Sequence, residues 1–64
     1  MWTVVYISMD LNMAIEIEDK LREEGFLIKR QVLDSDEDEK LYQILAPEFE
    51  AEEIQLVLFD LGLL

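Results

Sequence analysis

The sequence predicts a single α+β domain spanning 1–64, in which two helices cover one face of a three-stranded sheet. An uncharged run of β-branched and aromatic residues opens the chain at 2–7, which is typical of a strand. Two stretches with the apolar spacing of a helix follow at 11–24 and 48–61, and a glycine ends each one. Between the two helices lie two more apolar stretches separated by a short acidic segment, which indicates a β-hairpin.

The first strand is apolar on both of its alternating faces, as in a strand that is covered on both sides. We assign Val5 and Ile7 to the face under the helices, and Trp2, Val4 and Tyr6 to the open face. The opposite assignment remains the alternative, because the two sets of side chains are similarly apolar.

The first helix is predicted over 11–24, with Asp10 as its capping residue and Gly25 as its left-handed end. At about 100° per residue, four apolar side chains share the face that we expect to lie on the sheet: Met13, Ala14, Ile17 and Leu21. Leu11 and Ile15 lie off that stripe, so they belong either to the rim of the core or to the surface that meets a partner.

The second and third strands are predicted at 26–33 and 41–46. Their short separation makes them an antiparallel hairpin. Arg30 interrupts the pattern, because it falls on the alternating set that we assign to the core. A strand that projects beyond the helix layer would let the guanidinium group of this residue reach water.

The acidic segment at 34–39 imitates the start of a calcium-binding loop through Asp34, Asp36 and Asp38. Such a loop needs a glycine at its sixth position and a bidentate glutamate at its twelfth, where this chain has Glu39 and Leu45. We therefore interpret the segment as a solvated turn that keeps the sheet soluble, and predict no metal site there.

The second helix is predicted over 48–61, between Pro47, which ends the third strand, and Gly62. Its core face carries Ala51, Ile54, Val57, Leu58 and Leu61. Three large apolar side chains lie on roughly the opposite side, which is unusual for a small monomer: Phe49, Leu56 and Phe59.

The order β-α-β-β-α makes the first two strands parallel and places the third strand between them. This is a ferredoxin-like arrangement that lacks the last strand, so the outer edge of the first strand is free. The helical and strand faces converge on a predicted core of Val5, Ile7, Met13, Ile17, Leu21, Phe26, Ile28, Ile44, Ile54 and Leu58. The open face of the sheet then carries Trp2, Val4, Tyr6, Leu27 and Leu45.

The charge of the chain excludes several classes of function. Sixteen acidic and five basic residues give a net charge of −11, which opposes binding to nucleic acid or anionic lipid. No apolar run approaches the roughly 18 residues of a membrane span, and no basic leader precedes the first strand. We therefore expect a cytoplasmic protein that contacts neither nucleic acid nor membrane.

The chain offers little for catalysis, because it contains no histidine and no cysteine. Ser8 lies near Asp10 without a base, and a hydrogen bond at the helix start accounts for it. We predict that the protein is not an enzyme and holds no cofactor and no metal.

Three apolar motifs resemble a known family: MWTVVYI at 1–7, EEGFL at 23–27 and ILAPE at 44–48. Together they are similar to small, uncharacterised bacterial proteins of clostridial type in the prokaryotic signal-transducing protein family. The resemblance implies a βαββα fold and no defined activity. The chain differs from the family pattern at Phe49, where relatives often have a capping serine, and at Arg30, where they often have an apolar residue.

Two functions from different classes remain after these exclusions. The first is an interaction or regulatory module that works through protein–protein contacts, as a homo-oligomer or with another protein. The second is a small-ligand sensor that binds a metabolite at a dimer interface, although the turn after the first strand has no glycine to hold an anion. The candidate interface residues are Trp2, Val4, Tyr6, Leu11, Ile15, Phe49, Leu56 and Phe59.

Overall fold

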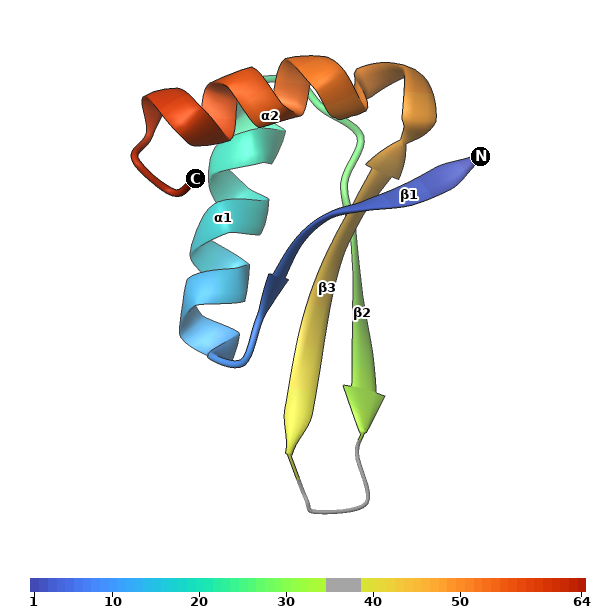
Figure 1. Ribbon diagram of the computed structural model, residues 1–64, viewed down its shortest axis with the longest axis vertical. Coiled ribbons are helices and arrows are strands. Elements are labelled where there is room, and N and C mark those ends of the chain that lie inside the picture. Colours follow the sequence, from blue (N-terminus) through green and yellow to red (C-terminus); the bar gives the residue numbers. More distant parts are fainter. Residues whose placement is uncertain (35–38) are drawn as a thin grey trace.

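The fold consists of three strands, two α-helices and one short 3-10 helix (Figure 1). In chain order these are β1 (Trp2–Ser8), α1 (Leu11–Glu23), β2 (Lys29–Asp34), β3 (Lys40–Pro47), η1 (Glu48–Glu50) and α2 (Ala51–Asp60). The computed structural model describes residues 1–34 and 39–64, so most of the predicted acidic turn, and with it the calcium-loop hypothesis, lies outside the described residues.

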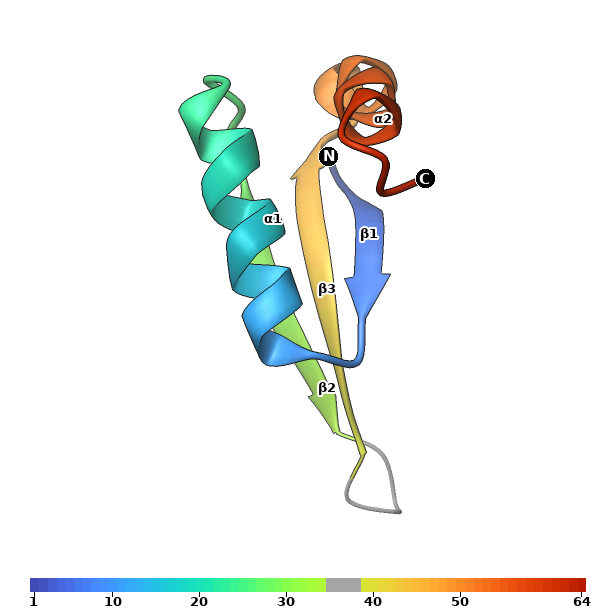
Figure 2. The same ribbon diagram turned by 90° about the vertical axis from the view of Figure 1, so that its left-hand side faces the viewer.

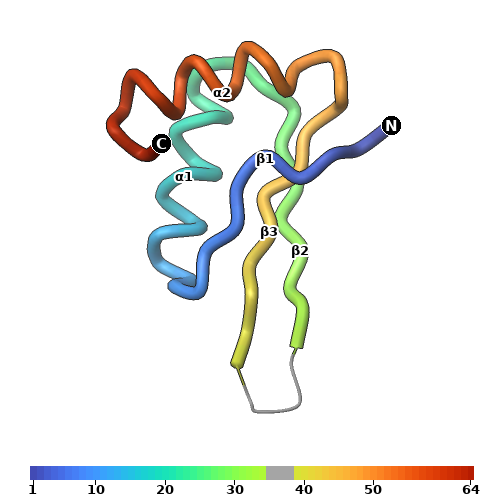
Figure 3. Tube along the Cα trace, viewed as in Figure 1, coloured from blue at the N-terminus to red at the C-terminus, as the bar shows by residue number. Residues whose placement is uncertain are grey.

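The sheet has the strand order β1-β3-β2, and β3 is antiparallel to both of its neighbours. Both helices lie on the same side of this sheet (Figure 2). α1 packs along all three strands, whereas α2 lies crosswise near one end of the sheet and packs on β1. The Cα trace shows the β2–β3 hairpin extending past the end of α1 (Figure 3). The predicted fold class and strand order are confirmed.

Local capping chemistry determines both ends of α1. The Asp10 carboxylate accepts hydrogen bonds from the backbone N–H groups of Asn12 at 2.9 Å and Met13 at 3.4 Å. Ser8 supports this turn, because its Oγ accepts from the Asp10 N–H at 3.0 Å. At the other end, Gly25 has φ +94°, where side chains with a Cβ are strained. The predicted cap and terminator are therefore confirmed.

Substitution of Asp10 tests whether its carboxylate stabilises the start of α1. We expect Asp10→Ala to lower the free energy of unfolding by about 0.5–2 kcal/mol, because two helix N–H groups lose their acceptor. Asp10→Asn keeps an acceptor oxygen and should lose much less. Asp19→Ala, in the same helix but away from its cap, is the matched control for removing an aspartate. Urea unfolding followed by circular dichroism measures all three, and an Asp10→Ala variant as stable as Asp19→Ala would contradict the expectation.

The core lies between the helices and the covered face of the sheet. Nine buried residues form it: Val5, Ala14, Ile17, Leu21, Ile28, Ile44, Ala46, Ile54 and Leu58. Seven of the ten predicted core residues are in this cluster, and an eighth, Phe26, is half-buried and packs against it. Met13 was predicted wrongly and is 37% exposed. The buried side of α1 consists of Ala14, Ile17, Glu18 and Leu21. It therefore includes Glu18, on the side of the helix away from Met13, and leaves Met13 at the surface.

A β-bulge explains why the predicted alternation of β1 fails after its middle. β1 pairs with β3 in one register before Val5 and in another from Tyr6 onward, so Val5 is an extra residue. Tyr6 is paired with the buried Ile44 and packs against the core, whereas Ile7 is 53% exposed. Placing Ile7 in the core and Tyr6 on the open face was therefore wrong, because the bulge reverses which side chains face the helices.

Three other element boundaries differ from those predicted. β2 begins at Lys29, so the exposed Leu27 lies before the sheet and not on its open face. The second helix begins as η1 and becomes α-helical only at Ala51. Leu61, predicted on the core face of the second helix, is exposed because α2 ends at Asp60 and the chain turns at Gly62, which has φ +77°.

Candidate protein-interaction surfaces

The outer edge of β1 is the first candidate surface. Within the described parts of the sheet, β1 pairs with β3 alone, and its seven residues WTVVYIS carry no charge. The backbone N–H of Glu48 donates to the Met1 carbonyl at 2.8 Å. The alternation of an antiparallel ladder then turns the backbone groups of Trp2 and Val4 away from β3, toward the free edge. An unpaired, uncharged edge is a template for another strand.

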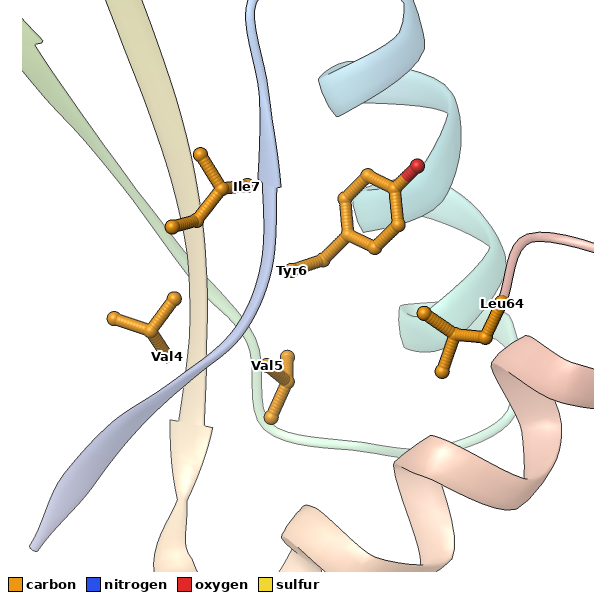
Figure 4. A pocket seen from close by; sticks show the side chains of 5 residues that line it. All are labelled: Val4, Val5, Tyr6, Ile7 and Leu64. Atoms are coloured by element: carbon orange, nitrogen blue, oxygen red, sulfur yellow. The ribbon is translucent and has the colours of Figure 1, made fainter.

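A groove of about 410 Å³ lies beside this edge. Val4, Val5, Tyr6 and Ile7 line it from β1, and Leu64 lines it from the C-terminal segment (Figure 4). Val4 and Ile7 point to one side of the strand, whereas Val5 and Tyr6 point to the other side, toward the helices and Leu64. The bulge therefore gives this stretch two successive side chains on the helix side, and the groove is mainly apolar.

One backbone group at the bulge already has a side-chain partner. The Gln55 side-chain amide of α2 donates to the Val5 carbonyl at 3.3 Å. This bond ties α2 to β1 at the point where the strand is irregular. The regular segments on either side of the bulge remain for pairing with another strand.

The open face of the sheet is less apolar than the edge. Trp2 and Val4 are exposed on this face, as predicted. Leu45 of the central strand β3 is buried there, because it lies between Val4 of β1 and Lys29 of β2. The Lys29 ammonium lies 5.5 Å from the centre of the Trp2 ring, within the range of a cation–π interaction. The lysine stem and charge therefore cover part of this face, which disfavours an apolar partner there.

An ion cluster around one buried carboxylate explains the position of Arg30. Glu18 on α1 is 6% exposed, and its carboxylate accepts from Arg30 Nη1 at 3.0 Å and lies 3.2 Å from Arg22 Nη2. Arg30 therefore faces inward as its position in the strand indicates, because Glu18 provides a countercharge there. This cluster joins α1 to β2 and serves the fold.

The outer side of α2 is the second candidate surface. Phe49 in η1 is 86% exposed, and Leu56 and Phe59 in α2 are 63% and 68% exposed. On the opposite side, Ile54 and Leu58 are completely buried in the core. The predicted exposure of three large apolar groups on this helix is thus observed, and their role in an interface stays a prediction.

The candidate interface residues fall on separate surfaces. Trp2 and Val4 lie along β1, and Tyr6 lies on the helix side of the same strand, where it lines the groove. Leu11 is exposed and Ile15 half-buried on α1. Phe49, Leu56 and Phe59 lie on the outer side of η1 and α2. The structure therefore joins Val4 and Tyr6 in one groove and does not join them to α2.

Sequence reasoning missed three residues with specific contacts, two at the groove and β1 and one in the ion cluster. Leu64 reaches the groove only because the chain reverses at Gly62, and nothing in its local sequence signals this. Gln55 bonds to a strand far away in the chain. Glu18 did carry a signal, since Arg22 follows it at the four-residue spacing of helical ion pairs.

Among residues 1–34 and 39–64, no group of three acidic side chains could hold a metal ion. No described helix is both long enough and apolar enough to cross a membrane. Comparison with known protein families found no match for the chain. Comparisons with curated proteins and with solved structures also found no match.

Proposed function

We propose that this protein is a small regulatory interaction module that works through protein–protein contacts, and that it forms a homodimer through the free edge of β1. The observation that carries this proposal is the uncharged outer edge of β1, which has no strand partner among the described residues and lies beside an apolar groove. The resemblance to prokaryotic signal-transducing proteins implies no defined activity, so the regulatory role is proposed from the exposed surfaces alone. The lack of histidine and cysteine supports a non-catalytic role, and the lack of cysteine suits a reducing cytoplasm.

Charge favours self-association at β1 over the other surfaces. A net charge of −11 makes two copies repel each other in general. Pairing two β1 strands places no charged side chain in the new ladder, because residues 2–8 contain none. Backbone hydrogen bonds and burial of the groove residues would then stabilise the dimer, in the way that strand addition stabilises other complexes. Association should strengthen when salt screens the repulsion.

Lysines placed on the two edges of the sheet test this dimer. We expect Val4→Lys/Ile7→Lys to raise the dimer dissociation constant by about tenfold or more, because charged edge residues prevent strand addition. The control is Val32→Lys/Leu33→Lys on β2, whose side chains have similar exposure and which makes the same change in net charge. Sedimentation equilibrium at micromolar concentration and moderate salt measures both.

Wild-type protein should sediment as twice the 7.6 kDa chain mass. A single species of the chain mass, unchanged by added salt, would overturn the dimer. Equal weakening by the β1 and β2 variants would overturn the assignment to β1.

The groove also favours the second candidate function, a small-ligand sensor that binds a metabolite at a dimer interface. Its volume of about 410 Å³ falls within the roughly 300–1,000 Å³ range of small-molecule sites. A thermal-shift screen distinguishes the two functions, since a ligand that binds the folded state raises the unfolding temperature in a saturable way. A saturable shift that Val4→Lys/Ile7→Lys abolishes would favour the sensor, and no shift from any metabolite would favour the interaction module.

A further inference from the structure

We infer that the outer side of α2 binds a basic amphipathic helix of a partner protein. This inference rests on the proposed interaction role but not on the pairing of β1, because it concerns a different surface. The docking surface consists of the exposed apolar residues Phe49, Leu56 and Phe59 with the exposed acidic residues Glu48, Glu52, Glu53 and Asp60.

The apolar residues form a stripe along one side of the helix. Leu56 and Phe59 are three residues apart and therefore adjacent on the helix surface. Phe49 lies in η1, before α2 begins at Ala51, and its side chain is exposed as well. The core anchors Ile54 and Leu58 hold the other side of α2 against the sheet. The stripe is consequently fixed in position and faces outward, and aromatic groups of this kind serve as anchors in protein interfaces.

The charge around the stripe selects the partner. All five basic residues of the chain lie within 20–40, so neither η1 nor α2 contains one. The ion pairs in the described parts of the chain use Glu16 and Glu18, and none uses an acid of η1 or α2. A second copy would bring these unneutralised carboxylates together, and nucleic acid or anionic lipid would be repelled. A partner with lysine or arginine beside an apolar stripe complements both properties of the surface.

A helical partner suits the shape of the surface. Leu56 and Phe59 lie on a helix of ten residues, and Phe49 lies in the 3-10 helix that precedes it. Two helices pack by fitting the side-chain ridges of one into the grooves of the other, and adjacent exposed side chains such as Leu56 and Phe59 provide part of such a ridge. The surface thus calls for a helix with a narrow apolar face bordered by cationic residues.

The probe is a synthetic amphipathic helix of leucine and lysine, compared with a version that has glutamate at each lysine position. We expect the lysine peptide to shift the backbone NMR signals of residues 48–60 in ¹⁵N-labelled protein, with an affinity that falls as salt rises. The glutamate peptide should not bind. Leu56→Ser should weaken binding by about tenfold, as expected for an interface anchor. Met9→Ser, at nearly the same exposure but remote from α2, should have no effect.

A second pair of variants distinguishes binding at the α2 surface from general attraction of the peptide to an acidic protein. Glu52→Gln/Glu53→Gln removes two carboxylates from α2, and Glu23→Gln/Glu24→Gln removes two from the end of α1. Only the first should reduce peptide affinity. Equal reductions would show attraction to the whole acidic chain and overturn the inference, as would NMR shifts that lie mainly outside 48–60. Loss of dimer in Leu56→Ser would show that a second copy covers α2, which overturns both this inference and the β1 interface.

Discussion

Ile17→Ala is expected to lower the free energy of unfolding by about 2–5 kcal/mol, because it leaves a cavity in a core that cannot close around it. Ile17 is 1% exposed and lies among the large side chains that α1, α2 and β3 contribute to the core. At roughly 0.05–0.15 kcal/mol per residue, a domain of this size has about 3–10 kcal/mol of total stability. The variant should therefore lose a large share of this stability, and it should be partly unfolded at room temperature if the total lies at the lower end of the range.

Leu11→Ala is the matched control for this change. It removes an aliphatic side chain from the same helix, but Leu11 is 40% exposed and its loss leaves no enclosed cavity. We expect a urea midpoint close to that of the wild type for Leu11→Ala and a much lower one for Ile17→Ala. Similar midpoints for the two variants would contradict the packing of α1 described here.

Arg30→Leu is expected to have the next largest effect, about 1–3 kcal/mol, because it leaves the buried Glu18 carboxylate with fewer hydrogen bonds. The loss stays below that of a fully broken buried pair because Arg22 remains within 3.2 Å of the carboxylate. The double variant Glu18→Leu/Arg30→Leu should recover most of the stability, since it removes the buried charge as well. Urea unfolding of the two single variants and the double variant measures this coupling.

The pair between Lys20 and Glu16 supplies the control for Arg30→Leu. Its N–O distance is 3.7 Å and both side chains are about half exposed, so Lys20→Leu should change stability by less than about 1 kcal/mol. If Arg30→Leu is no more destabilising than Lys20→Leu, the Glu18 cluster does not contribute to stability. If the double variant is as unstable as Arg30→Leu, the loss comes from packing of the arginine stem and not from charge.

The parts of the fold that depend on local chemistry could be predicted from the sequence. Asp10 and Gly25 locate α1 to within a residue, because a cap and a left-handed turn act on their immediate neighbours. The exposed apolar side of α2 follows from helical periodicity alone. These features need no knowledge of which elements meet in space.

Features that depend on contacts between distant elements could not be predicted in the same way. The bulge at Val5 leaves no mark in the sequence, because Val5 and Tyr6 are both ordinary strand residues and only the register of β3 reveals the extra one. The inward direction of Arg30 was visible, but its reason required Glu18, twelve residues earlier on another element. The groove likewise required the C-terminal turn to bring Leu64 beside β1.

The unlike edges of the sheet bear on how far assembly of this protein can proceed. An edge that pairs with its own copy around a two-fold axis is used up, and growth stops at two chains. An edge that pairs with the opposite edge of the next copy instead leaves a free edge at each step and builds a filament. β2 carries Lys29, Arg30 and Asp34 along its length, whereas β1 carries no charge. Bringing β2 of one chain to β1 of another would strip water from Lys29 and Asp34 without offering them countercharges, so the sheet resists open-ended polymerisation.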